Sequence, residues 1–240
     1  MVNTNYVKLN YYLIVIALLI CSDLYAQESI ANDSTRIDDR YREDQFYLGV
    51  TFNLLTNKPE AMEQNGFSGG LHFGYIRDMP INERRNWAIG VGAGLSMNTY
   101  NQNLFVGEMP SEESIFRIID NQIDYDKNWF STYLVEMPIQ LRWRTSTAST
   151  YKFWRIYTGL QLGYVYAYKF NFEQQGNKVI QTDVPEFERY RLGLTFSFGY
   201  DTFNFFFYYN INPFFSDAVS LEGSPVQLNS LKLGLMFYIL

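Results

Sequence analysis

Alternation of apolar with small or polar residues is the dominant pattern of this chain, and it is clearest over Trp87–Asn98. The odd positions carry Trp, Ile, Val, Ala, Leu and Met, whereas the even positions carry Ala, three Gly, Ser and Asn. Because successive side chains of a strand point to opposite faces, the pattern predicts a strand with one apolar face and one small or polar face. A tilted strand of about 9 to 11 residues crosses a bilayer, and its apolar face then contacts lipid.

The same alternation recurs along the chain, so that eight strands are expected at 45–55, 67–77, 87–98, 132–144, 153–169, 188–200, 203–212 and 230–240. The connections alternate between long ones (56–66, 99–131, 170–187 and 213–229) and short ones (78–85, 145–152 and 201–202). Long loops at one end and short turns at the other are typical of bacterial outer-membrane barrels. We therefore predict an all-β fold, an eight-stranded antiparallel up-and-down transmembrane β-barrel over 45–240, with long extracellular loops and short periplasmic turns.

The N-terminal segment has the features of a secretory signal peptide. Lys8 precedes an apolar run over Tyr11–Ile20, which is too short to span as a helix, and a small residue, Ala26, marks the expected cleavage site. Cys21 raises the alternative of lipid attachment, but the bulky Ile20 before it argues against that modification. We predict a signal peptide over 1–26 and a flexible, charged periplasmic extension over 27–44, followed by the barrel.

Composition supports export and membrane insertion. The chain contains 20 Tyr and 20 Phe, a net charge of -6 and a single Cys. A mature chain that lacks this Cys has no disulfide and no thiolate metal site, and the acidic balance argues against nucleic acid as a partner. Trp and Tyr fall near the expected strand ends, as interfacial aromatic girdles require. They include Trp87, Trp129, Tyr133, Trp143, Trp154, Tyr164, Tyr166, Tyr190 and Tyr200.

Glu136 is the most informative polar residue, because it alternates with residues expected to face lipid and should therefore point into the lumen. An isolated charge there would be costly, so it requires a partner. Pairing of the fourth and fifth strands about their turn places it opposite 159–161. We predict a polar lumen network of Glu136, Gln161 and one or more of Arg142 and Arg155. Such a network would specify register and close the lumen, while conduction or proton transfer through it is the alternative.

The other candidate groups have simpler interpretations. His72 is the only histidine, and its nearest acid in sequence, Asp78, is expected at a turn, which favours a lumen-packed side chain over a catalytic one. One histidine also argues against a protein-only transition-metal site. The glycines of 90–94 lie inside a strand, so they do not form a dinucleotide loop. They should leave room for lumen side chains such as Tyr157, Phe206 or Tyr208. No cofactor is expected.

Charged residues also mark the two ends of the predicted barrel. Arg142, Arg144 and Arg155 surround one short turn, where we expect them to meet lipid phosphates at the periplasmic rim. The longest loop is acidic and is read either as a docking or cation-collecting surface or as a simple solvated loop. Its charged residues are Glu108, Glu112, Glu113, Asp120, Asp124 and Asp126, against Arg117 and Lys127, and Phe116, Ile118 and Ile119 suggest a short folded-back segment within it.

Several segments resemble the PorT-like outer-membrane beta-barrel family of Bacteroidetes-type bacteria. They are Val135–Arg142, with an apolar-Glu-x-Pro strand and a following basic residue, the Tyr- and Gly-rich Tyr157–Tyr164, the hairpin Gly193–Asn212, and the C-terminal Lys232–Leu240, which resembles a barrel-assembly signal. The resemblance implies an outer-membrane location and a small antiparallel barrel. The family's namesake is associated with protein secretion across the outer membrane by the type IX system, and no catalytic residues carry over.

Eight strands enclose an interior that side chains fill, which argues against a wide aqueous channel. The leading hypothesis is a non-enzymatic outer-membrane protein with a structural or accessory interaction role, linked to secretion. Its expected partners are outer-membrane lipid and other envelope or secretion proteins, contacted through extracellular loops or periplasmic turns. The alternatives are a narrow porin-like channel, a lipid-modifying enzyme that uses His72, and a soluble lipocalin-like periplasmic barrel.

Overall fold

The computed structural model describes residues 44–109, 111, 113–120, 122–145 and 153–239. The predicted signal peptide over 1–26, with Cys21, and all but the last residue of the predicted extension over 27–44 lie outside the described residues. Among the residues described, no helix is long and apolar enough to cross a membrane.

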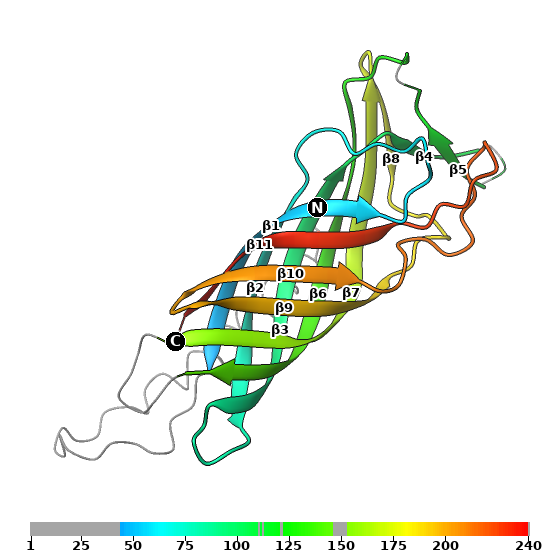
Figure 1. The fold of residues 1–240 in the computed structure, drawn as a ribbon. Coiled ribbons are helices and arrows are strands. Elements are labelled where there is room, and N and C mark those ends of the chain that lie inside the picture. Colours follow the sequence, from blue (N-terminus) through cyan, green and yellow to red (C-terminus); the bar gives the residue numbers. More distant parts are fainter. Residues whose placement is uncertain (1–43, 110, 112, 121, 146–152, 240) are drawn as a thin grey trace, which may run out of the picture. The chain divides into compact units, whose positions relative to one another are not determined.

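Eight strands close into an antiparallel barrel (Figure 1). In order around the wall they are β1 (Gln45–Thr56), β2 (Gly69–Pro80), β3 (Trp87–Asn101), β6 (Lys127–Arg144), β7 (Trp154–Gln174), β9 (Tyr190–Tyr200), β10 (Phe203–Asn210) and β11 (Asn229–Ile239). The first and last strands close the wall, since Phe46 pairs with Ile239 and Thr56 pairs with Asn229. The prediction of an eight-stranded antiparallel barrel is confirmed.

The described chain also forms three short strands, all on the side of the long connections. Strands β4 (Leu104–Glu108) and β5 (Ser114–Ile118) form a separate two-stranded sheet within the longest loop. Strand β8 (Asn177–Gln181) pairs with the last residues of β7 and forms a hairpin that projects beyond the barrel. We call this side the loop end and the opposite side, where the strands are joined by short connections, the turn end.

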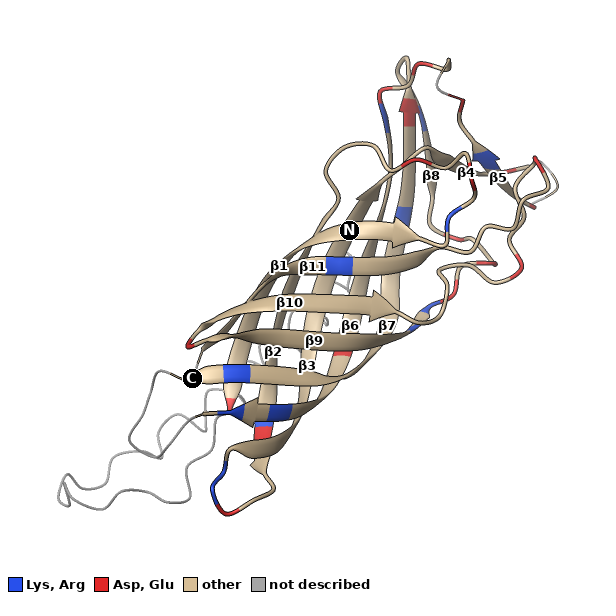
Figure 2. Ribbon diagram, in the orientation of Figure 1, with Lys and Arg blue, Asp and Glu red and all other residues tan. Residues whose placement is uncertain are grey.

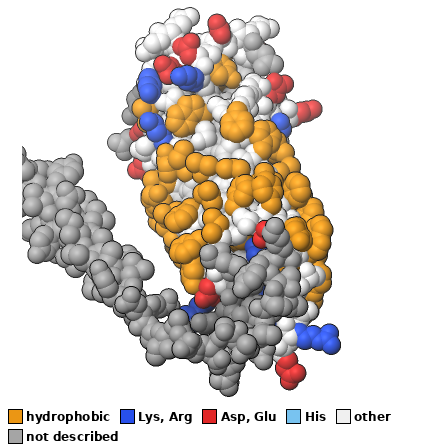
Figure 3. All heavy atoms as spheres, turned by 90° about the vertical axis from the view of Figure 1, so that its left-hand side faces the viewer, with side chains coloured by type: hydrophobic (Ala, Val, Ile, Leu, Met, Phe, Trp, Pro, Cys, Tyr) orange, Lys and Arg blue, Asp and Glu red, His pale blue; other side chains and the backbone are white. Residues whose placement is uncertain are grey.

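The barrel wall is apolar outside and polar inside. Along β1, Leu48, Val50 and Phe52 are each more than 40% exposed, whereas Thr51 and Asn53, which alternate with them, are buried. A space-filling view shows the apolar side chains gathered in a band over the barrel, with charged side chains above and below it (Figure 3). On the ribbon, charged residues are sparse along the strands and frequent in the connections (Figure 2). This pattern fits a wall that contacts hydrocarbon and not water.

Exposed aromatic residues mark the two edges of this band. Trp154 lies at the turn end of β7 and contacts Tyr200, while Tyr164 lies near the loop end and contacts Tyr190. The ten residue steps from Trp154 to Tyr164 rise about 33 Å along a strand. A strand tilt of about 40° reduces this to about 25 Å, which is the height of the apolar band of outer-membrane barrels.

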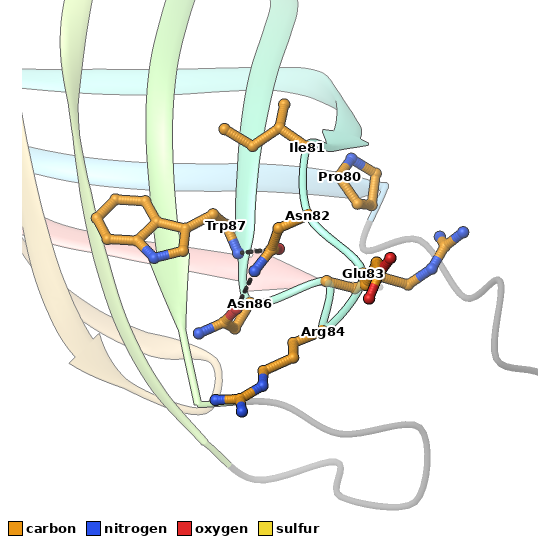
Figure 4. A pocket seen from close by; sticks show the side chains of 8 residues that line it. Pro80, Ile81, Asn82, Glu83, Arg84, Asn86 and Trp87 are labelled. Atoms are coloured by element: carbon orange, nitrogen blue, oxygen red, sulfur yellow. Dashed lines mark hydrogen bonds between the residues drawn. The ribbon is translucent and has the colours of Figure 1, made fainter.

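At the turn end, the short connection Pro80–Trp87 joins β2 to β3 and is locally hydrogen-bonded (Figure 4). The Asn82 side chain accepts a hydrogen bond from the backbone nitrogen of Trp87 at 3.1 Å and donates to Asn86 at 2.6 Å. Arg85 adopts a left-handed conformation with φ of 54°. The connection therefore forms a tight turn around an open surface hollow, and its Glu83 and Arg84 side chains are exposed.

The glycines of β3 provide space on the inner wall, but for neighbours other than those expected. A Cβ atom at Gly94 would lie 2.0 Å from the Tyr47 hydroxyl, and one at Gly92 would lie 2.7 Å from Ile76. The expected neighbours were Tyr157, Phe206 and Tyr208. The side chains over these glycines come instead from β1 and β2, whereas β10, which carries Phe206 and Tyr208, lies on the opposite side of the barrel.

Candidate functional site: a filled lumen beneath a folded cap

The turn end of the lumen contains a buried ionic cluster centred on Asp78. Its two carboxylate oxygens accept hydrogen bonds from Arg142 at 3.0 Å and from Arg144 at 2.8 Å, and Arg142 also donates to Gln45. The Arg142 guanidinium lies over the Tyr157 ring, 4.2 Å from its centroid. All five side chains are at most 1% exposed. The cluster joins β2 to β6 across β3 and closes the lumen at this end with paired charges.

This arrangement corrects the expectation that the arginines of the turn end meet lipid headgroups. Arg142, Arg144 and Arg155 are 0%, 0% and 1% exposed. Arg142 and Arg144 share the inward phase of β6 with Gln140, and the Arg155 guanidinium packs over the Phe153 ring at 4.5 Å. Strand phase therefore directs these guanidinium groups into the lumen and not toward the membrane surface.

A second polar cluster lies at mid-depth around Glu136, which is 3% exposed. Its carboxylate accepts a hydrogen bond from the Ser96 hydroxyl at 2.6 Å, and its other oxygen lies 3.6 Å from Nδ1 of His72. On the far side of the imidazole, Nε2 lies 3.2 Å from the Thr51 hydroxyl, which in turn donates to Asn53 at 2.8 Å. Strands β1, β2, β3 and β6 are thus connected through one chain of polar contacts.

The four residues predicted to form one network lie at two levels of the lumen. Glu136 on β6 is paired with Gly163 on the neighbouring strand β7, and Gln161 lies two residues closer to the turn end. Arg142 is six residues from Glu136 along the same strand, a separation of about 20 Å, and Arg155 lies beyond it, opposite Arg144. The polar partners of Glu136 are therefore Ser96 and His72, and the acidic partner of Arg142 is Asp78.

The displacement has a simple cause in the register of one hairpin. The backbone nitrogen of Thr145 donates to the carbonyl of Trp154, which fixes the β6–β7 pairing at the turn end. This pairing places Gly163 opposite Glu136, whereas the register expected from the sequence had residues 159–161 at that position. A closing pair cannot be located from sequence when a turn carries no Gly-based hairpin signal.

His72 has a different acidic neighbour from the one considered in the sequence. Asp78 binds two arginines at the turn end, whereas Glu136, 64 residues away in sequence, lies beside the imidazole. The order hydroxyl, imidazole, carboxylate in Thr51, His72 and Glu136 is the one that nucleophilic catalysis uses. However, the three side chains are at most 5% exposed, and the Thr51 hydroxyl donates its proton to Asn53 and not to the imidazole.

Large side chains occupy the lumen around and between the polar clusters. The Lys232 ammonium lies over the Tyr208 ring at 4.7 Å, and Phe206 contacts the His72 ring at 6.1 Å between centroids. These aromatic residues belong to one buried apolar cluster, composed of Tyr47, Ile76, Tyr157, Phe206, Tyr208, Met236 and Tyr238. The interior is therefore packed with side chains, as expected for eight strands.

The long connections are folded into one unit, which we call the cap and define as the described residues of 57–68, 102–131, 165–189 and 211–228. Backbone hydrogen bonds join its connections pairwise. Asn103 donates to Glu63, Leu221 donates to Phe116, Asp126 donates to Glu173, and Glu188 donates to Phe214, at 2.8 to 3.1 Å. Each connection is thus bonded to a neighbouring one, and the cap has defined backbone structure.

The cap contains the larger apolar core of the described chain. Phe215, which is 0% exposed, makes ring contacts with Phe116, Phe170 and Phe187 at 5.2 to 5.9 Å. Three barrel residues next to the cap, Leu55, Tyr100 and Leu134, complete this core. Its cap residues are Met62, Leu104, Val106, Phe116, Phe130, Val165, Tyr168, Phe170, Val184, Phe187, Phe214, Phe215, Ala218, Val226 and Leu228. The folded-back segment expected around Phe116 is present as the β4–β5 hairpin.

The outer surface of the cap is largely polar and acidic. Exposed side chains of the longest loop include Glu108, Arg117, Asp120 and Asp124. Several apolar side chains are exceptions, among them Phe67, Ile180, Val219 and Leu221, which are 76%, 44%, 55% and 64% exposed. The cap therefore presents isolated apolar groups on a charged surface.

Comparison with known proteins agrees with the geometry. No curated protein matches the chain at a significant level. The model of one family, described as the outer membrane protein beta-barrel domain, matches residues 25–216. The match covers most of the chain and includes seven of the eight barrel strands. The closed barrel, its lipid-facing band and this match together show that the chain belongs to the outer membrane protein beta-barrel domain family.

Proposed function

We propose that this protein is a non-conducting, non-enzymatic anchor that presents its cap at the outer-membrane surface as a docking platform for another envelope protein. The observation that carries the proposal is the cap itself. Its connections share an apolar core and are joined by backbone hydrogen bonds. Loops that only remain solvated outside the membrane do not need such a core. A folded surface held on a rigid barrel is suited to recognition of a protein partner.

A role in protein secretion is the more specific form of this proposal. The resemblance of Val135–Arg142 and of the C-terminal strand to PorT-like proteins supports it. The exposed Val219 and Leu221 provide apolar surface whose burial by a partner protein is favourable. The expected partner is therefore an envelope or secretion protein with an apolar patch and a basic rim.

Site-specific photocrosslinking in cells that produce the full chain tests this docking role. A crosslinker at Leu221 or Val219 should capture a defined envelope protein, and Leu221→Asp should abolish capture and lower export of secreted proteins. A crosslinker at the lipid-facing Phe205 is the matched control and should yield no protein adduct. Capture at Phe205 as strongly as at Leu221, or an unchanged pattern in Leu221→Asp, would contradict the proposal.

A lipid-modifying enzyme is the second candidate, favoured by the order of Thr51, His72 and Glu136. Burial of all three argues against substrate access. His72→Ala should leave the acylation of outer-membrane lipids unchanged if the protein is not an enzyme. An altered lipid profile in that strain would favour catalysis instead.

A narrow channel is distinguished by planar-bilayer recordings on the purified protein. The packed lumen predicts a silent membrane, and Glu136→Leu should lower thermal stability without preventing membrane insertion. Discrete conductance steps from the unmodified protein would support the channel.

A further inference from the structure

A small, partly open cavity of about 10 Å³ lies inside the barrel next to the cap residue Phe214. Its lining comes from β3, β6, β9, β10 and β11 and includes Arg191, Lys232, Tyr100, Tyr208 and Asn98. Two of these side chains are cations, and no carboxylate is among the described residues that line the cavity.

Arg191 is incompletely bonded in this cavity. It is 4% exposed, and one terminal nitrogen donates to the carbonyl of Tyr190 at 2.8 Å. Its Nε and second terminal nitrogen have no hydrogen-bond partner among the described residues. The guanidinium lies over the rings of Phe187 and Phe214, at 5.0 and 4.5 Å, which leaves its unpaired N–H groups without an acceptor.

Lys232 adds a second positive charge to the same space. It is 3% exposed, and it and Arg191 repel each other electrostatically. The acidic groups that act on this pair lie outside the cavity lining. Glu136 attracts Lys232 while bonded to Ser96, and Glu188 attracts Arg191 from the cap side. The lining of the cavity therefore carries two cations and no carboxylate, in a region where an unpaired charge is costly.

We propose that this cavity binds a single monatomic anion, with chloride as the physiological species. The space admits one sphere of about the size of a water molecule, which excludes phosphate or a carboxylate. The polar groups left unpaired on Arg191 are donors only, and an anion accepts hydrogen bonds from all of them. A water molecule would bring two further hydrogens and no charge. The site is independent of the docking role proposed above.

Thermal unfolding of the full protein in detergent tests the site. At constant sodium concentration, replacement of gluconate by chloride or bromide should raise the unfolding midpoint saturably. Arg191→Gln removes a charge-assisted donor and should raise the half-saturating halide concentration by about 10- to 100-fold. The exposed Lys178 of β8 provides the matched control, because Lys178→Gln removes a cation far from the cavity and should leave the halide dependence unchanged.

Diffraction from crystals of the unmodified protein grown in bromide gives a second result that does not depend on a variant. An anomalous peak within hydrogen-bond distance of Arg191 supports the proposal. A cavity that holds only water, or an unfolding midpoint that responds equally to gluconate and halide, overturns it. If Arg191→Gln does not fold, Lys232→Met is examined in the same titration, with the same expectation.

Discussion

The barrel and the cap of this chain bury opposite kinds of side chain. In the barrel, apolar side chains such as Leu160 face outward, while Glu136 and Arg142 are buried among other polar groups. In the cap, Phe170 and Phe215 are buried and the charged side chains lie outside. The hydrophobic effect drives the cap core because water surrounds it. In hydrocarbon that driving force is absent, so interior hydrogen bonds and paired charges specify the barrel instead.

Strand β7 belongs to both regions and changes phase where they meet. Tyr133 pairs with Ala167 and Leu134 pairs with Val165, so that Tyr166 is one extra residue on β7. A one-residue bulge moves every following side chain to the other face. Even-numbered residues such as Leu160 therefore face lipid below the bulge, whereas Tyr168 and Phe170 face the cap core above it.

Insertion of one alanine after Ala167 should break this arrangement and have the largest effect. With one more residue on β7 above the bulge, Tyr168 and Phe170 would turn outward, and the cap core would lose both rings. We expect a loss of stability at least as large as that of Phe170→Ala, about 3–5 kcal/mol. Limited proteolysis should show a cap that is cleaved while the barrel remains inserted and protected. A protected cap in the insertion variant would show that the number of residues on β7 does not decide which face Tyr168 and Phe170 occupy.

The next largest effect is expected at the turn end of the barrel. Asp78→Asn removes the carboxylate that binds Arg142 and Arg144, and leaves two buried guanidinium groups with one fewer negative charge. Breaking a buried ion pair from one side costs about 3–5 kcal/mol. Denaturant-dependent refolding into lipid vesicles measures this loss. Cap proteolysis should be unchanged, because the cluster lies at the opposite end of the lumen.

The membrane-spanning part of the fold is readable from sequence because its alternation has a period of two and continues through each strand. The segments expected at 203–212 and 230–240 differ from β10 and β11 by at most two residues at either end. The cap was not predicted as a folded unit. Its residues come from four separate connections, and their core forms only when those connections pack together. The bulge at Tyr166 also escapes detection, since Tyr164, Tyr166, Tyr168 and Phe170 continue the alternation.

The interior contacts were predictable in kind but not in partner. Alternation alone indicated that Glu136 faces the lumen and requires a polar neighbour. The choice of neighbour depends on register across several strands, and the β6–β7 register differs from the expected one by about three residues. Ser96 gave only a weak signal, as a hydroxyl on the small face of β3. Asp78 was misinterpreted, because its position near a turn gave no indication that its side chain is buried inside the lumen.

Two positions of nearly equal exposure distinguish a surface that contacts lipid from one that contacts water. Leu160, on the wall midway between the aromatic edges, is 42% exposed, and Ile180, on the cap, is 44% exposed. An arginine near the bilayer midplane costs about 2–4 kcal/mol, whereas a surface substitution in water changes stability by about 0.5 kcal/mol or less. Refolding titrations in vesicles should therefore separate Leu160→Arg from Ile180→Arg. Equal costs would mean that the band does not contact hydrocarbon.

The smallest effect compares one hydroxyl from each region. Ser96 donates to the Glu136 carboxylate at 2.6 Å in the barrel, and in the cap the Tyr168 hydroxyl accepts from the backbone nitrogen of Val184 at 2.8 Å. Hydrogen bonds to charged groups contribute about 1.5–3 kcal/mol and neutral ones about 0.5–1.5 kcal/mol. Ser96→Ala should therefore be more destabilising than Tyr168→Phe in the same denaturant titration. The reverse order would indicate that Glu136 does not depend on its hydroxyl partner, and that packing of large side chains specifies the lumen as it does the cap.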